Sequence, residues 1–164
     1  MEQTKSTRIE PLLYLYDTHT TFFRNVLDGI SDEDAHKRMD SKANHIAWLA
    51  GSLVQQRFDL VKLLTGDEPK QQAYDLFKDY QGIKDDVTYP SLSTFVEDWN
   101  MITPITREAL ANASDETLDK IFDMEDMKMP YFELVAFSIH REAYFIGQIG
   151  LWRRILGYEP MKYQ

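Results

Sequence analysis

The sequence predicts an all-α protein: a four-helix bundle with a long crossover between its second and third helices and with short accessory helices. Four long segments repeat apolar residues at steps of three and four, which is the period of a helix with one apolar face. One long polar connection separates the second segment from the third, and no stretch shows strand-like alternation. Because each helix is too apolar on one face to be stable alone, residues 1–164 are expected to form a single domain around one core.

The first long helix is predicted over residues 11–30. Pro11 suits a first helical turn, because its fixed φ is helical and its missing N–H has no helical partner there. Ser31 can then cap a short helix over residues 31–39, whose first turn is acidic.

The second long helix is predicted over residues 42–64, with Gly66 ending it. The crossover, residues 67–90, is polar and interrupted by proline and glycine. Because a structureless loop of that length is uncommon in a compact domain, a helical turn is expected around residues 73–80.

The third long helix is predicted over residues 91–112, with Pro104 inside it and a kink expected there. A short helix over 115–122 and a methionine-rich loop over 124–129 follow. The fourth long helix is predicted over residues 130–157.

Composition and charge restrict the classes of function. The absence of cysteine excludes disulfides, thiolate nucleophiles and Cys-ligated zinc. A net charge of −9 repels a phosphate backbone, so a nucleic acid is not expected as a partner. Residues 1–9 lack the apolar core of a signal peptide, and the longest nearly apolar run, 46–54, is too short to span a bilayer. A membrane is therefore not expected as a partner, and the expected location is the cytoplasm.

Two segments carry a resemblance to a known family. One reads Asn44-His45-Ile46-Ala47-Trp48-Leu49-Ala50-Gly51-Ser52-Leu53-Val54, and the other reads Arg141-Glu142-Ala143-Tyr144-Phe145-Ile146-Gly147-Gln148-Ile149. They resemble the DinB-like four-helix bundles, in which the first segment usually ends Trp-x-x-Gly-His and the second reads His-Glu-x-x-His-x-Gly-Gln-Ile. The helix order and the long crossover also agree, so the resemblance spans nearly the whole chain.

The resemblance implies a metal-dependent enzyme. In the family, two histidines four residues apart lie on one face of the last long helix, and a third from the second long helix completes a three-imidazole site. Such a site leaves positions open for water or a substrate. The implied activity is that of a small-molecule (thiol) transferase or a hydrolase, with a divalent metal such as zinc or nickel.

This chain departs from the family pattern at all three ligand positions. Ser52 stands at the first histidine, and Arg141 and Phe145 stand at the pair. Phenylalanine has no donor atom, a guanidinium repels a cation, and a lone serine hydroxyl is a poor ligand for a transition metal. The residues therefore predict that no metal is bound at these positions.

The remaining histidines give only a weak alternative. No two of the four lie three or four residues apart, so no helix supplies a chelating pair. A shifted site formed by His19, His45 and a carboxylate stays open, although the favoured interpretation is that both are hydrogen-bonded residues of the core or its rim.

Arg141 lies on the face of the last helix that is expected to point inward, with Phe145 and Gln148. A buried guanidinium costs several kcal/mol unless it is paired. Two interpretations stay open: an ion pair with a buried carboxylate, or a bidentate contact with an anionic group of a ligand. The polar neighbours would be Ser52 and Gln148, and the apolar walls of the pocket would be Trp48, Trp99 and Phe145.

Two classes of function follow. The favoured hypothesis is a small-molecule-binding or structural bundle without the metal site of the family. The alternative is a metal-dependent transferase or hydrolase with a rearranged site. No residue is assigned a catalytic role.

The last long helix also predicts a homodimer. Phe137, Tyr144 and Leu151 repeat every seven residues, and Gly147 lies between the last two. One bundle core needs only one apolar stripe on each helix, so a second stripe is expected to meet either a second copy of the chain or the crossover residues 74–80.

Overall fold

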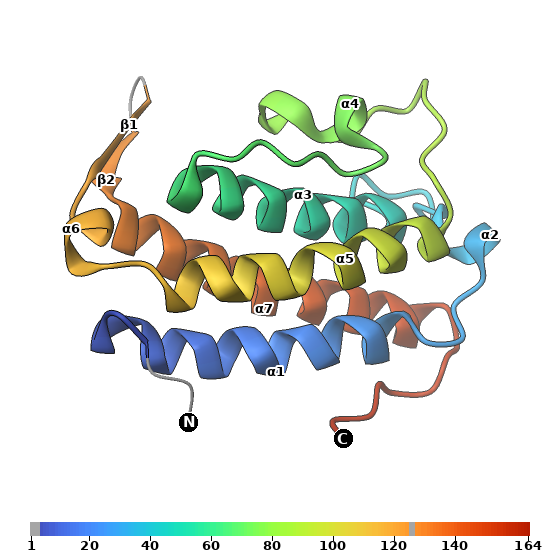
Figure 1. The fold of residues 1–164 in the computed structure, drawn as a ribbon. Coiled ribbons are helices and arrows are strands. Elements are labelled where there is room, and N and C mark those ends of the chain that lie inside the picture. The colour runs from blue at the N-terminus through green and yellow to red at the C-terminus, as the bar shows by residue number, and fades with distance from the viewer. Residues whose placement is uncertain (1–3, 125–126) are drawn as a thin grey trace.

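The computed structural model describes residues 4–124 and 127–164 and confirms the all-α bundle (Figure 1). Residues 1–3 of the polar N-terminus and residues 125–126 of the predicted loop lie outside the described part. The four long helices are α1 (Glu10–Leu27), α3 (Ile46–Thr65), α5 (Leu92–Ala111) and α7 (Tyr131–Ile155).

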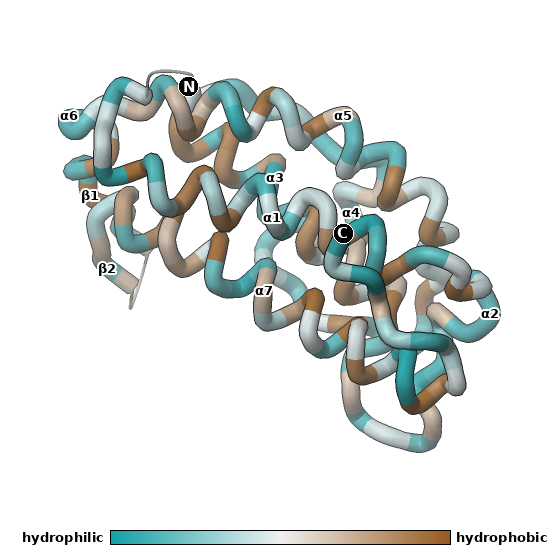
Figure 2. Tube along the Cα trace, turned by 90° about the horizontal axis from the view of Figure 1, so that it is seen from below, coloured by the Kyte–Doolittle hydropathy of each residue, from teal (hydrophilic) through white to brown (hydrophobic). Residues whose placement is uncertain are grey.

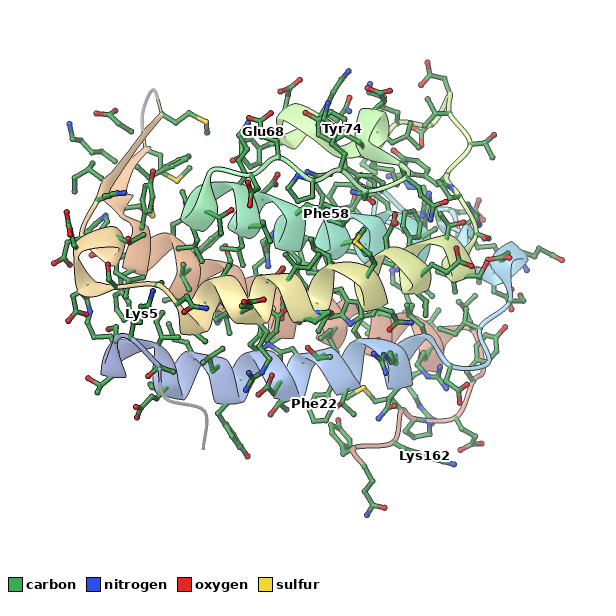
Figure 3. All side chains as sticks on the ribbon, in the orientation of Figure 1. Lys5, Phe22, Phe58, Glu68, Tyr74 and Lys162 are labelled. Atoms are coloured by element: carbon green, nitrogen blue, oxygen red, sulfur yellow. The ribbon has the colours of Figure 1, made fainter. Side chains whose placement is uncertain are left out.

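The four long helices form a closed ring, in which α1 packs against α5 and α7, and α3 packs against the same two helices. Figure 1 shows that α3 and α5 run in the same direction, opposite to α1 and α7. A chain that leaves α3 at one end must therefore return along its length before α5 can begin. This geometry explains the long crossover, and side chains fill the space between the four helices (Figure 3).

The ends of α3 follow from local chemistry. His45 is the N-cap, and its Nδ1 accepts a hydrogen bond of 3.0 Å from the backbone N–H of Trp48. At the other end Gly66 adopts φ +84°, a left-handed conformation that glycine enters without steric cost. The helix therefore begins four residues later than predicted and stops where predicted.

The crossover contains the predicted helical turn, as α4 (Tyr74–Phe77) followed by a 3₁₀ helix (Lys78–Tyr80). Phe77 is buried against α3, where a Cβ at Gly51 would overlap the Phe77 ring. The crossover thus covers α3, and it does not cover the second apolar stripe of α7. The intrachain alternative for that stripe is wrong.

The accessory elements differ most from the prediction. A 3₁₀ helix (Thr7–Ile9) precedes α1, and α2 (Asp32–Ala35) and α6 (Asp115–Leu118) each have only four residues.

After α6 the chain forms an antiparallel hairpin of β1 (Ile121–Met124) and β2 (Met127–Pro130), where a helix end and a loop were expected. An ion pair of 2.8 Å between Asp123 and Lys128 joins its paired residues. No strand had been predicted because the two arms are only four residues each, too short to show alternation. In the described part of the chain, no helix is long and apolar enough to cross a membrane.

Candidate functional site

The packing of α3 against α7 brings Ser52, Arg141 and Phe145 together. One terminal nitrogen of the Arg141 guanidinium, Nη2, donates a hydrogen bond of 2.7 Å to Ser52 Oγ. The other, Nη1, donates a hydrogen bond of 2.9 Å to Gln56 Oε1. The guanidinium carbon lies 4.1 Å from the centre of the Phe145 ring, within range of a cation–π interaction.

The charge of Arg141 is not neutralised by an ion pair. Arg141 is half-buried, and within the described residues it forms no ion pair with a carboxylate. Burial lowers the pKa of Arg141 below its usual value, while the more distant carboxylates of Asp59 and Glu142 raise it. A guanidinium stays protonated in proteins. Most of the Arg141 side chain is buried, as predicted, but the interpretation as an ion pair with a buried carboxylate is wrong, because its hydrogen-bond partners are neutral.

An apolar depression adjoins the guanidinium. It has a volume of about 320 Å³ and is lined by Phe137, His140, Arg141, Tyr144 and Phe145. Trp48 lies behind it, with its ring centre 6.1 Å from that of Phe145. The buried indole N–H of Trp48 donates to no described residue. The arrangement offers a cation beside aromatic surface.

Two of the predicted site residues lie elsewhere. Gln148 is half-buried beside Leu151 and Trp152 in a second depression of about 380 Å³, away from the Arg141 guanidinium. Trp99 is completely buried in the centre of the bundle, stacked on Phe23 with ring centres 3.9 Å apart. The second partner of Arg141 is Gln56, one turn after Ser52 on α3. Sequence reasoning did not assign Gln56 to the site.

The two histidines of the alternative site are separated. His45 caps α3 beside the rings of His36 and Tyr89, and burial, followed by the nearby His36, lowers the pKa of His45 to about 4. His19 is buried at the centre of the bundle, where its Nδ1 lies 3.4 Å from Glu142 Oε2 without reaching hydrogen-bond geometry. No group of three His, Cys, Asp or Glu side chains within residues 4–124 and 127–164 is arranged to hold a metal ion.

The core also contains a buried ion pair that sequence reasoning missed. Arg57 of α3 and Glu142 of α7 are both fully buried and form a bidentate ion pair, with N–O distances of 2.7 and 3.0 Å. The other terminal nitrogen of Arg57 donates to the hydroxyls of Thr20 and Thr103, and the guanidinium stacks between the rings of Tyr16 and Trp99. This network of contacts lies at the centre of the four long helices, and its role is structural.

The contacts of this network also act on the pKa of Glu142. Burial alone would raise the pKa of Glu142. The charge and the hydrogen bonds of Arg57, together with the nearby His19, lower this pKa below its usual value. Both carboxylate oxygens of Glu142 accept hydrogen bonds from Arg57, and Glu142 forms no ion pair with Arg141, one residue away.

Ser52, Arg141 and Phe145 do not fit a divalent metal. A cation placed between Ser52, Arg141 and Phe145 would meet one hydroxyl, one positive charge and one hydrocarbon ring. The Ser52 hydroxyl is already the acceptor of the guanidinium hydrogen bond. The charged group at this site is therefore the Arg141 guanidinium itself.

Comparisons with known proteins show the fold. A DinB-like protein from Bacillus cereus ATCC 10987 superposes with a TM-score of 0.64 at 19% identity, over 99% of each chain. A conserved protein from Enterococcus faecalis superposes with a TM-score of 0.69 at 12% identity, over 87% of this chain and 93% of that one. No protein-family model and no curated protein sequence matches the chain.

Proposed function

We propose that this chain is a DinB-like bundle in which the metal-ligand positions have become a binding site for a small anion. The carboxylate or similar group of the ligand contacts Arg141, and its apolar body lies on Phe137, Tyr144 and Phe145. The protein acts as a binding module, as a homodimer and in the cytoplasm. The metal-dependent transferase or hydrolase has no donor set among the described residues to support it.

The observation that carries this proposal is the guanidinium of Arg141. Two of its five N–H groups donate to neutral acceptors, and the remaining three have no acceptor among the described residues. A half-buried guanidinium next to apolar surface prefers a charged acceptor, because a charge-assisted hydrogen bond is stronger than one to a neutral oxygen. Ser52 and Gln56 fix its orientation, so little side-chain entropy is lost when a ligand binds.

Titration calorimetry with phenylacetate, an anion with a small aromatic body, tests the proposal. Phenylacetate is expected to bind, whereas the neutral isostere phenylacetamide is expected to bind at least about tenfold more weakly, because a hydrogen bond to a charged group contributes roughly 1.5–3 kcal/mol. Arg141→Gln should remove the preference for the anion. Inorganic phosphate serves as a second probe without an apolar body.

Arg24→Gln is the matched control, since Arg24 is an exposed arginine of α1 outside this site. It should leave the affinity for phenylacetate unchanged. The proposal is wrong if neither phenylacetate nor phosphate binds, or if Arg141→Gln and Arg24→Gln bind phenylacetate equally well.

A further inference from the structure

A row of polar residues runs along the side of α3 that faces Arg141. Ser52, Gln56 and Asp59 follow one another at steps of four and three residues, so their side chains share one face of the helix. The first two are the hydrogen-bond partners of Arg141. The third is a carboxylate, about 4.5 Å of helical rise beyond Gln56. The helix face that orients the cation therefore also carries an anion.

The direction of the helices places Asp59 relative to the apolar depression. Because α3 and α7 run in opposite directions (Figure 1), residues that follow Gln56 lie beside residues that precede Arg141. A hydrogen bond of 2.7 Å from Gln56 Nε2 to the backbone oxygen of Ser138 fixes this register. The residue before Ser138 is Phe137, which lines the depression. Asp59 therefore lies toward the Phe137 end of the depression.

The carboxylate of Asp59 is half-buried and forms no ion pair within the described residues. Its Oδ1 accepts a hydrogen bond of 2.8 Å from Gln55 Nε2. Burial raises the pKa of Asp59 above its usual value, although this hydrogen bond and two nearby cations counteract the rise. One of these cations is the exposed Lys62, which pairs with Glu68 at 2.6 Å. The other is Arg141.

Arg141 and Asp59 thus act on each other without forming an ion pair. Each charge shifts the pKa of the other group toward ionisation. Gln56 orients the guanidinium and Gln55 orients the carboxylate, so each charge is held by a neutral amide. A half-buried charge that has lost part of its water prefers an oppositely charged partner. A ligand with one group of each sign would supply both partners at once.

The surroundings of these two charges are apolar. Figure 2 shows hydrophobic segments recurring along α7, and the depression beside Arg141 is lined mainly by aromatic rings. The Phe145 ring packs against the guanidinium itself. A ligand that consists of charged groups alone would leave this apolar surface in water. The ligand is therefore expected to carry an apolar body as well as its two charges.

We propose that the ligand of the Arg141 site is a zwitterion, namely an α-amino acid with an aromatic or other apolar side chain. Its carboxylate binds Arg141, its ammonium group binds Asp59, and its side chain lies against Phe137 and Phe145. An α-amino acid carries both charges on one carbon, which suits a cation and an anion about one helical turn apart. This inference rests on the proposed function, because it assigns a second charge to the same ligand.

Titration calorimetry with L-phenylalanine and with hydrocinnamate, which is phenylalanine without its amino group, tests the second charge. The wild-type protein is expected to bind phenylalanine at least about tenfold more tightly, because the ammonium group adds a charge-assisted hydrogen bond. Asp59→Asn should abolish this preference and keep the affinity for hydrocinnamate. Asparagine retains an acceptor for Gln55, and circular dichroism confirms that the variant is folded.

Glu97→Gln is the matched control, since Glu97 is an exposed carboxylate of α5 outside this site. It should keep the preference for phenylalanine. The inference is overturned if the wild-type protein binds the two ligands equally well, or if Asp59→Asn prefers phenylalanine as strongly as the wild type does.

The same two ligands separate this inference from the proposed function. If hydrocinnamate binds and Arg141→Gln loses it, but phenylalanine binds no more tightly, the anion site stands and only the zwitterion is wrong. If neither ligand binds the wild-type protein, both are wrong. If Asp59→Asn loses phenylalanine while Arg141→Gln binds it as the wild type does, the carboxylate does not contact Arg141 and both are again wrong.

Discussion

Glu142→Gln is expected to lower the free energy of unfolding by about 3–5 kcal/mol, measured by urea denaturation at neutral pH, because it leaves a buried cation without its counter-ion. Arg57 has no access to water and forms its only ion pair among the described residues with Glu142. Glutamine keeps the shape of the side chain, so the effect is one of charge. Glu133→Gln on the same helix is the matched control, since Glu133 is exposed and should change stability by no more than ~0.5 kcal/mol.

The loss of stability in Glu142→Gln is expected to depend on pH in a definite direction. The pKa of Glu142 in the folded protein is below its usual value of 4.5, so the unfolded chain binds the proton more readily. The stability that Glu142 contributes is therefore fully present above pH ~4.5 and is lost as the pH falls through the lower folded pKa. The difference between wild type and Glu142→Gln should shrink in that acid range. A difference that stays below ~0.5 kcal/mol at neutral pH would contradict a charged pair.

Trp99→Ala is expected to cost about 3–5 kcal/mol of unfolding free energy, because it opens a large cavity in the core. The Trp99 ring is completely buried, and the Arg57 guanidinium carbon lies 3.4 Å from its ring centre. The variant removes both packing against Phe23 and the cation–π contact. Chemical denaturation measures the loss.

Met101→Ala is the control for this change, since Met101 is an exposed residue of the same helix. It should alter stability by ~0.5 kcal/mol or less. Because Trp99 does not contact Arg141, the folded Trp99→Ala protein should bind phenylacetate as the wild type does. A loss of stability below ~1 kcal/mol would mean that Trp99 is not in the core.

The long helices were predictable because their apolar periodicity extends over many turns. Local signals also gave correct ends where a single residue decides them, as at Gly66. The four-residue arms of the hairpin gave no such signal. The short helix α2 ends at Ala35, before the predicted end near Met39, and Met39 and Asp40 beyond it adopt positive φ, which is uncommon for residues other than glycine.

The predicted inward face of α7 was too narrow, and this was the main source of error in the site. The buried arc of α7 includes Ser138, Phe145 and Trp152 of the predicted stripe, and it extends one residue further, to Val135, Ile139, Glu142, Ile146 and Ile149. Because α7 carries apolar residues around its circumference, periodicity alone does not define the width of the buried arc. The predicted stripe also favoured the arginine as the buried charge, whereas the neighbouring glutamate is the fully buried one.

The grouping of Ser52, Arg141 and Phe145 came from the family resemblance, because no spacing rule relates α3 to a helix some 90 residues later. The resemblance could not identify the neutral partners of Arg141. Gln56 lies one turn beyond Ser52, and only the packing of the two helices places its amide oxygen next to the guanidinium.

The equivalence of these three positions to a three-histidine site is tested most directly by zinc calorimetry on the triple variant Ser52→His, Arg141→His and Phe145→His. The contacts between α3 and α7 place the three side chains together, so three imidazoles there should bind zinc that the wild-type protein does not bind. Circular dichroism confirms that the variant is folded. A folded triple variant with no gain in zinc affinity, or a wild-type protein that binds zinc equally well, would contradict the assignment of these positions.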